Sequence, residues 1–83
     1  MRRKIEDNGA VTLSGVPVGI AATVIAVNGS SRITRRLLEM GVIPGVVVHV
    51  IKTAPFGDPI EVRLRGYNLA MRRSEAEAIE VSI

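Results

Sequence analysis

The stretch Arg35–Gly45, RRLLEMGVIPG, decides how the chain is organised, because it contains a clear helix end. Gly41 stands where the backbone after a helix turns left-handed, a conformation that glycine adopts without strain. Pro44 has no backbone N–H and cannot continue the helix. Gly45 then completes a turn into the next apolar run. The stretch therefore predicts a short helix that stops at about residue 40 and is followed by a strand.

The start of the same helix is marked by two serines. Ser30 or Ser31 can cap the first turn, because a serine side-chain oxygen accepts a hydrogen bond from a free backbone N–H there. The residues at helical spacing that form one apolar stripe are Ile33, Leu37 and Met40. We therefore expect an amphipathic helix over about residues 31–40, with this stripe against the core.

The rest of the chain has the pattern of short strands separated by turns. Apolar and charged residues alternate most clearly in Ile60–Arg65, which is typical of a strand with one buried face. The expected strands are 11–13, 20–27, 46–51, 60–65, 69–72 and 79–83. One helical turn is expected at about 75–78, capped by Ser74. Since parallel strands would need longer crossovers, we predict a mainly β fold, a small antiparallel barrel of five to six short strands.

The composition indicates a single domain with an aliphatic core. The chain has 83 residues, of which 47% are hydrophobic and only 2% aromatic. Residues 1–10 are charged without periodicity, so we expect a flexible tail before a single domain at 11–83. The chain has no cysteine, which excludes disulfides and favours a cytoplasmic location. The apolar run 16–27 is too short to cross a bilayer, so no membrane insertion is expected.

Few side chains in the sequence can perform chemistry. A catalytic site needs several converging titratable or nucleophilic groups, whereas the only histidine, His49, lies in the middle of a valine-rich strand. We expect His49 to be an ordinary strand residue and the protein not to be an enzyme. One histidine without any cysteine cannot complete a transition-metal site within one chain. The sequence therefore predicts no metal site and no cofactor.

The charge favours an acidic partner without identifying it. The net charge is +3, and the basic residues are spread along the chain. Single-stranded nucleic acids are usually bound by stacking on aromatic rings, and this chain offers only Phe56 and Tyr67. We expect no nucleic acid partner, but a small RNA-binding barrel stays open as an alternative. Because both faces of 20–27 are apolar, a homodimer also stays open.

Four motifs in order, spread over residues 11–83, resemble the FeoA family. They are Arg36–Gly45, Ala54–Ile60, Leu69–Ala76 and Ile79–Val81. The resemblance implies an SH3-like β-barrel and a non-enzymatic cytoplasmic protein. It also implies an accessory role beside the large bacterial transporter of ferrous iron, with the GTP-binding cytoplasmic part of that transporter as the partner. Binding of a transition metal ion is attached to the family by association alone.

The resemblance also suggests a partner-binding surface. Arg36 and Glu39 belong to the helix-end motif, and Phe56 and Asp58 belong to the loop motif. We expect these four residues near the surface that binds the partner, although Asp58 could instead hold its turn and Phe56 could plug a barrel end. A further alternative is a metal-responsive regulatory domain, since the family is similar to the C-terminal domain of iron- or manganese-dependent repressors.

Overall fold

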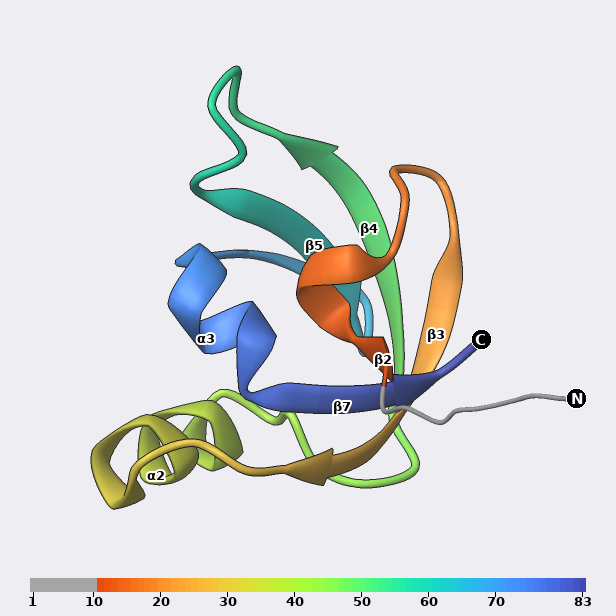
Figure 1. Cartoon of the computed structure of the whole chain (residues 1–83). Coiled ribbons are helices and arrows are strands. Elements are labelled where there is room, and N and C mark those ends of the chain that lie inside the picture. Colours follow the sequence, from red (N-terminus) through yellow and green to blue (C-terminus); the bar gives the residue numbers. More distant parts are fainter. Residues whose placement is uncertain (1–10) are drawn as a thin grey trace, which may run out of the picture.

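A computed structural model describes residues 11–83 and shows a strongly curved antiparallel sheet (Figure 1). Residues 1–10, where we expect the charged tail, lie outside the described residues. Six strands follow one another in the sheet in the order β2-β7-β3-β4-β5-β6. Their bounds are β2 (Val11–Thr12), β3 (Ala21–Val27), β4 (Val47–Thr53), β5 (Ile60–Leu64), β6 (Tyr67–Met71) and β7 (Ile79–Ser82). The prediction of a mainly β, antiparallel fold is confirmed.

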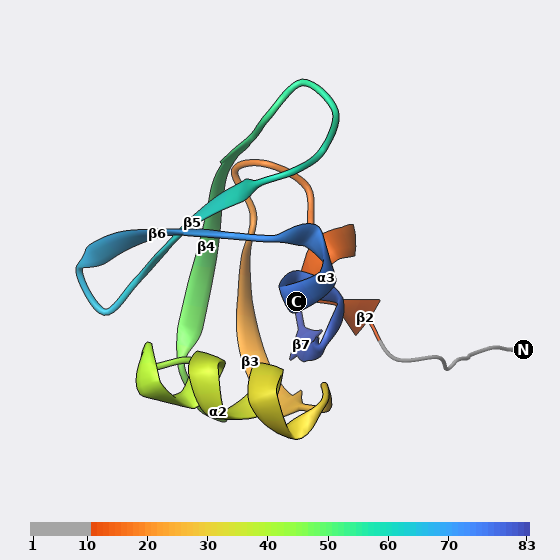
Figure 2. The same cartoon turned by 90° about the vertical axis from the view of Figure 1, so that its left-hand side faces the viewer.

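Within residues 11–83, three short helical elements accompany the sheet. They are the 3-10 turn η1 (Leu13–Gly15), α2 (Ser31–Glu39) and α3 (Arg73–Glu77). The helix α2 lies between β3 and β4 in sequence and covers one end of the sheet, as both views show (Figures 1 and 2). The helix α3 packs against η1. Because β2 and β6 are the two ends of the sheet and do not pair with each other, side chains of η1 and α3 complete the core.

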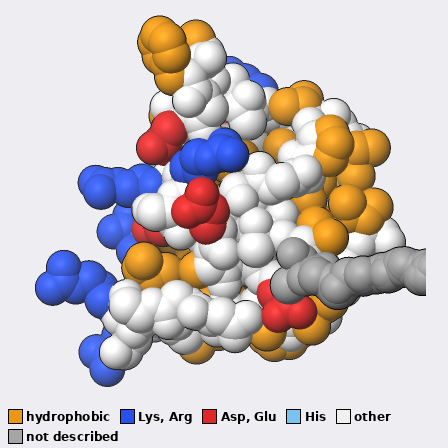
Figure 3. Space-filling model, viewed as in Figure 1, with side chains coloured by type: hydrophobic (Ala, Val, Ile, Leu, Met, Phe, Trp, Pro, Cys, Tyr) orange, Lys and Arg blue, Asp and Glu red, His pale blue; other side chains and the backbone are white. Residues whose placement is uncertain are grey.

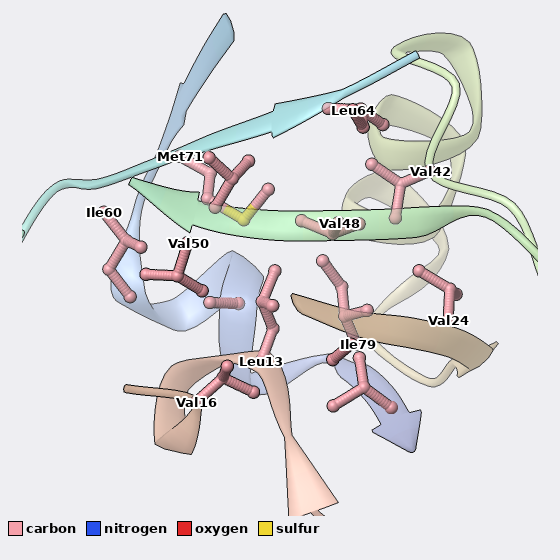
Figure 4. Close-up of a cluster of buried hydrophobic side chains, with 14 of the residues drawn as sticks. Leu13, Val16, Val24, Val42, Val48, Val50, Ile60, Leu64, Met71 and Ile79 are labelled. Atoms are coloured by element: carbon pink, nitrogen blue, oxygen red, sulfur yellow. The ribbon is translucent and has the colours of Figure 1, made fainter. Parts of the chain in front are cut away.

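The core is aliphatic, as the composition predicted, and lies on the concave side of the sheet (Figure 4). The alternation predicted for 60–65 is confirmed, because Ile60, Val62 and Leu64 are buried and Arg63 is exposed. The largest fully buried side chains are Leu13, Leu37, Ile60, Leu64, Met71, Ile79, Val24, Val42, Val48, Val50 and Val62.

The helix α2 has the start and the stop that its sequence predicts. The Ser30 hydroxyl accepts a hydrogen bond from the Ile33 N–H at 3.3 Å, so Ser30 is the cap. Gly41 has a φ of 90°. The Val42 N–H donates to the Leu37 carbonyl at 2.9 Å, which closes a Schellman motif. Leu37 and Val42 are both completely buried, so the end of the helix is part of the core.

The hairpin between β5 and β6 is tighter than the sequence pattern suggests. We expect one strand to end at residue 65 and the next to begin at residue 69, but the strands are joined by two residues, Arg65 and Gly66. Their φ angles are 51° and 86°, which suit the two-residue turn that matches strand twist. Tyr67 therefore pairs with Leu64 as part of β6.

The prediction that Ser74 caps the last helical turn is wrong. The helix α3 begins at Arg73, and Arg72 is its N-cap. The Glu75 carboxylate accepts a hydrogen bond from the Arg72 N–H at 2.9 Å, as the glutamate of a capping box does. A second carboxylate, from Asp58, accepts from the Arg73 N–H at 3.1 Å. Both contacts satisfy N–H groups that a helix leaves free.

Candidate partner-binding surface

The four residues predicted to bind a partner lie in two separate places. Arg36 and Glu39 are on α2, whereas Phe56 and Asp58 are in the loop between β4 and β5, and these two elements form opposite ends of the molecule (Figures 1 and 2). The helix α3 is tied to both ends, through an ion pair with α2 and a hydrogen bond with the loop. The four side chains therefore do not form one patch.

Arg36 is occupied by an internal ion pair. Its Nε lies 3.2 Å from Oε2 of Glu75, whose side chain is 9% exposed while that of Arg36 is 66% exposed. A buried carboxylate is costly unless it is paired and hydrogen-bonded. Glu75 meets both conditions, since its other oxygen accepts from the Arg72 N–H. Arg36 therefore connects α2 to α3 and neutralises a buried charge.

Glu39, by contrast, is exposed and available. Within residues 11–83 it forms no ion pair and no side-chain hydrogen bond. It lies at the border of two shallow hollows on the outer face of α2, and Leu38 beside it is 44% exposed. Lys and Arg side chains project from the same side of the molecule (Figure 3). The residues that line the two hollows are Gly29, Ser31, Arg32, Thr34, Arg35, Arg36, Leu38 and Glu39.

Phe56 and Asp58 have opposite roles in their loop. The side chain of Phe56 is 97% exposed, so it does not plug a barrel end. Asp58 is also exposed, but its carboxylate accepts a hydrogen bond from the first backbone N–H of α3. Asp58 thus fixes the loop against α3 and leaves Phe56 free to contact another molecule.

Sequence reasoning missed Glu75 and Tyr67. Glu75 has a local signal, because a glutamate three residues after a helix N-cap is typical of a capping box. Tyr67 has no such signal. Its hydroxyl donates a hydrogen bond to the carbonyl of Met40, 27 residues away, and lies 3.2 Å from where a side chain on Gly41 would begin. Tyr67 therefore connects β6 to the end of α2.

The described residues contain little that suggests catalysis or a metal centre. Within 11–83, no group of three or more His, Cys, Asp or Glu side chains could hold a metal ion. His49 is exposed on β4 and paired in register with Arg63 of β5, so it lies in a strand as predicted. None of the helices in this part of the chain has the length and apolar character needed to cross a bilayer.

Comparison with known proteins places the chain in a family. The sequence model of the FeoA domain matches residues 11–83, the whole region that the structure describes. The chain belongs to the FeoA domain family. A relative from Porphyromonas gingivalis is a fusion of Fe(2+) transport protein A with the Fe(2+) transporter FeoB. It is 37% identical over 71 residues, which are 86% of this chain and 8% of that protein. The chain thus spans less than a tenth of that relative.

Solved structures of FeoA proteins share the fold. A FeoA-like protein from Clostridium acetobutylicum is 36% identical, with a TM-score of 0.84 over 92% of this chain and 88% of that one. FeoA from Stenotrophomonas maltophilia, a prokaryotic SH3 domain protein complexed with zinc, is 34% identical, with a TM-score of 0.78. That match covers 88% of this chain and 91% of the other. The predicted SH3-like fold of this FeoA domain is confirmed.

The same fold occurs in a more distant class of protein. A manganese-dependent transcriptional repressor is 20% identical, with a TM-score of 0.82 over 90% of this chain and 37% of the repressor. At this level of identity the similarity shows that the two share a fold.

Proposed function

We propose that this FeoA domain protein is a non-enzymatic accessory of ferrous iron uptake. It acts on the cytoplasmic side by binding the GTP-binding part of the transporter FeoB. The observation that carries the proposal is the Porphyromonas gingivalis relative, in which the two proteins are one chain. Fusion raises the effective concentration of one domain for another and is favoured where the two act together.

The exposed surface of the domain supports binding rather than chemistry. Glu39 and Phe56 are free to touch a partner, and the basic side chains near α2 suit an acidic surface. Arg36 and Asp58 would contribute to the same interaction indirectly, because each positions α3 relative to a contact element. Glu39 and Phe56 thus contact the partner, whereas Arg36 and Asp58 hold the contact elements in place.

The proposal is tested by calorimetry with the cytoplasmic domain of FeoB from the same organism. Titrations with GDP and with a non-hydrolysable GTP analogue would show binding in at least one state, and an unrelated GTP-binding domain would show none. Absence of heat in both nucleotide states, confirmed by absence of co-elution, would contradict the proposal.

The metal-responsive alternative makes a different prediction. A sensor domain would show saturable, site-specific NMR shifts on titration with micromolar ferrous, manganous or zinc ions. We expect no such shifts, because one exposed histidine provides a single strong ligand for these metals. Binding of RNA that weakens steeply with salt would instead favour the nucleic-acid alternative.

The homodimer stays a prediction. The outer face of β3 exposes Ile25, and Val47 on the neighbouring strand is exposed as well. Sedimentation equilibrium over a hundredfold concentration range tests for a second copy.

A further inference from the structure

The loop between β4 and β5 presents one aromatic side chain to solvent. Phe56 is 97% exposed, and hydrophobic side chains project from the molecule at the tip of this loop (Figure 3). A phenylalanine that contributes nothing to its own core exposes a large apolar area to water. Aromatic side chains that become buried when two proteins bind contribute much of the binding free energy.

The loop holds Phe56 in a defined place. The Ala54 N–H donates to the Pro59 carbonyl at 3.0 Å, and the Gly57 N–H donates to the Ala54 carbonyl at 2.8 Å. Two prolines limit the backbone further. Asp58 attaches the loop to α3 through the Arg73 N–H. Since the loop is ordered before binding, less conformational entropy is lost when Phe56 is buried.

The surface beside the loop has a shallow hollow with an ion pair at its border. This hollow is lined in part by Pro55, the residue before Phe56, and is bordered by a Lys52–Glu61 ion pair with a separation of 3.7 Å. Glu61 also accepts a hydrogen bond from Asn68 at 3.2 Å. The hollow is lined by Lys52, Thr53, Ala54, Pro55, Pro59, Glu61 and Ala70. A loop that carries a projecting aromatic side chain and also borders a recess with an ion pair at its edge suits an anchor within a polar rim.

We propose that Phe56 is the anchor with which this domain docks, inserting into an apolar pocket on the cytoplasmic part of FeoB. This inference rests on the proposed function and adds the contact point. The hollow beside the loop receives a side chain of the partner, so that the two surfaces interlock. The end of the molecule that carries α2 is not required for this anchor.

The charges near the loop favour a protein pocket over a lipid surface. Insertion into an anionic membrane is assisted by unpaired Lys and Arg beside the apolar group. Here Lys52 is paired with Glu61, and Arg73, whose guanidinium lies beside Gly57, is paired with Glu77. Asp58 adds a carboxylate within the loop itself. A single aromatic side chain whose neighbouring cations are already paired gains little from an anionic bilayer, whereas a preformed pocket can bury it completely.

The central experiment compares Phe56→Ala with Ile83→Ala in calorimetry against the cytoplasmic domain of FeoB. Ile83 is 71% exposed, so its truncation controls for the loss of surface apolar area in general. We expect Phe56→Ala to weaken binding at least tenfold and Ile83→Ala to change it less than twofold. Both variants should unfold at the wild-type urea concentration, because neither side chain is in the core.

A spectroscopic variant reports burial directly. The chain contains no tryptophan, so Phe56→Trp introduces a single fluorescent reporter at the tip of the loop. We expect its emission to shift to shorter wavelength when the FeoB domain is added, and to stay unchanged with vesicles of phosphatidylglycerol and phosphatidylcholine. A blue shift with vesicles alone would overturn the proposal in favour of membrane docking.

The remaining outcomes separate this inference from the proposed function. If the wild type binds and Phe56→Ala binds equally well, the anchor is refuted while the proposed function stands. If the wild type does not bind at all, both are refuted. If the wild type self-associates and Phe56→Ala abolishes only that self-association, the loop is a contact between copies and the anchor is again refuted.

Discussion

At the scale of single residues, the most informative side chain is Glu75. It is the one charged residue that is buried within the described part of the chain, with 6% of the whole residue exposed. Its two oxygens have separate partners, the Arg72 N–H and the Arg36 side chain. This buried carboxylate fixes the position of α3 against α2. Without it, both the Arg72 N–H and the Arg36 side chain would lose this partner.

Glu75→Ala should therefore destabilise the fold. Removing it loses a helix cap and a charge-assisted hydrogen bond, together about 2 kcal/mol. Arg36→Ala should have a comparable effect, because it leaves the carboxylate buried without its counter-charge. Urea unfolding followed by circular dichroism measures both.

Arg35→Ala is the matched control for that series, since Arg35 is exposed and forms no ion pair within residues 11–83. It should change the unfolding free energy by less than about 0.5 kcal/mol. Equal stability of all three variants would refute a structural role for the ion pair.

Tyr67→Phe tests the residue whose role has no signal in the local sequence. The substitution removes only the hydroxyl that donates to the Met40 carbonyl. A typical hydrogen bond of this kind contributes about 1 kcal/mol. We expect a loss of that size, with faster amide hydrogen exchange at the end of α2, because that end loses its connection to β6. Unchanged exchange in α2 would contradict the contact.

At the scale of elements, α2 and its exit form the best-determined unit. A serine cap, an apolar stripe and a glycine stop agree with one another, and the observed helix follows them. The loop 54–59 is different. Its prolines and glycine predict a turn, but only the hydrogen bond to Arg73 fixes its position on α3.

Gly41→Ala tests the exit from α2. Its φ of 90° is unfavourable for any residue with a side chain, and the new methyl group would lie 3.2 Å from the Tyr67 hydroxyl. We expect a loss of about 1–2 kcal/mol in thermal or urea unfolding.

Gly15→Ala serves as its control, because a methyl group there meets no atom within 4 Å and no positive φ opposes it. It should be neutral or slightly stabilising. A Gly41→Ala protein as stable as the Gly15→Ala protein would show that the Schellman turn tolerates a side chain.

At the scale of the whole molecule, the last strand holds the fold together. β7 lies between β2 and β3 in the sheet, so the beginning and the end of the described chain are neighbours. Ile79 and Val81 of β7 are buried in the core. Such long-range pairing means that no large part of the chain can form its sheet alone.

Deletion of residues 79–83 should therefore abolish folding. It removes the central partner of two strands and two core side chains, a loss larger than the total stability of many small domains. The amide spectrum of the truncated protein should lose its dispersion. Deletion of Ile83 alone, which is 71% exposed, should leave the spectrum and the unfolding free energy nearly unchanged. A well-dispersed spectrum for the longer truncation would contradict this account.

The sequence alone determined the class of fold, the helix α2 and the aliphatic core. These follow from local rules: alternation with a period of two, helical spacing, and residues such as Gly41 whose backbone conformation few other residues can adopt. The four ordered motifs also identified the family. The prediction at Ser74 was wrong because carboxylates of the nearby Glu75 and the distant Asp58 accept the N–H groups at the start of α3. The prediction at the β5–β6 turn was wrong because a two-residue turn matches the strand twist.

Only the tertiary structure decided which candidate residues are free to bind. Because Arg36 and Asp58 are charged, the sequence predicts that both are free at the surface. Each instead has an internal partner in α3, 39 residues away in the chain for Arg36 and 15 residues away for Asp58. Phe56 is hydrophobic and suits a core, yet it stands in solvent. A side chain's partners depend on which distant segments the sheet brings beside it, and no local pattern encodes that arrangement.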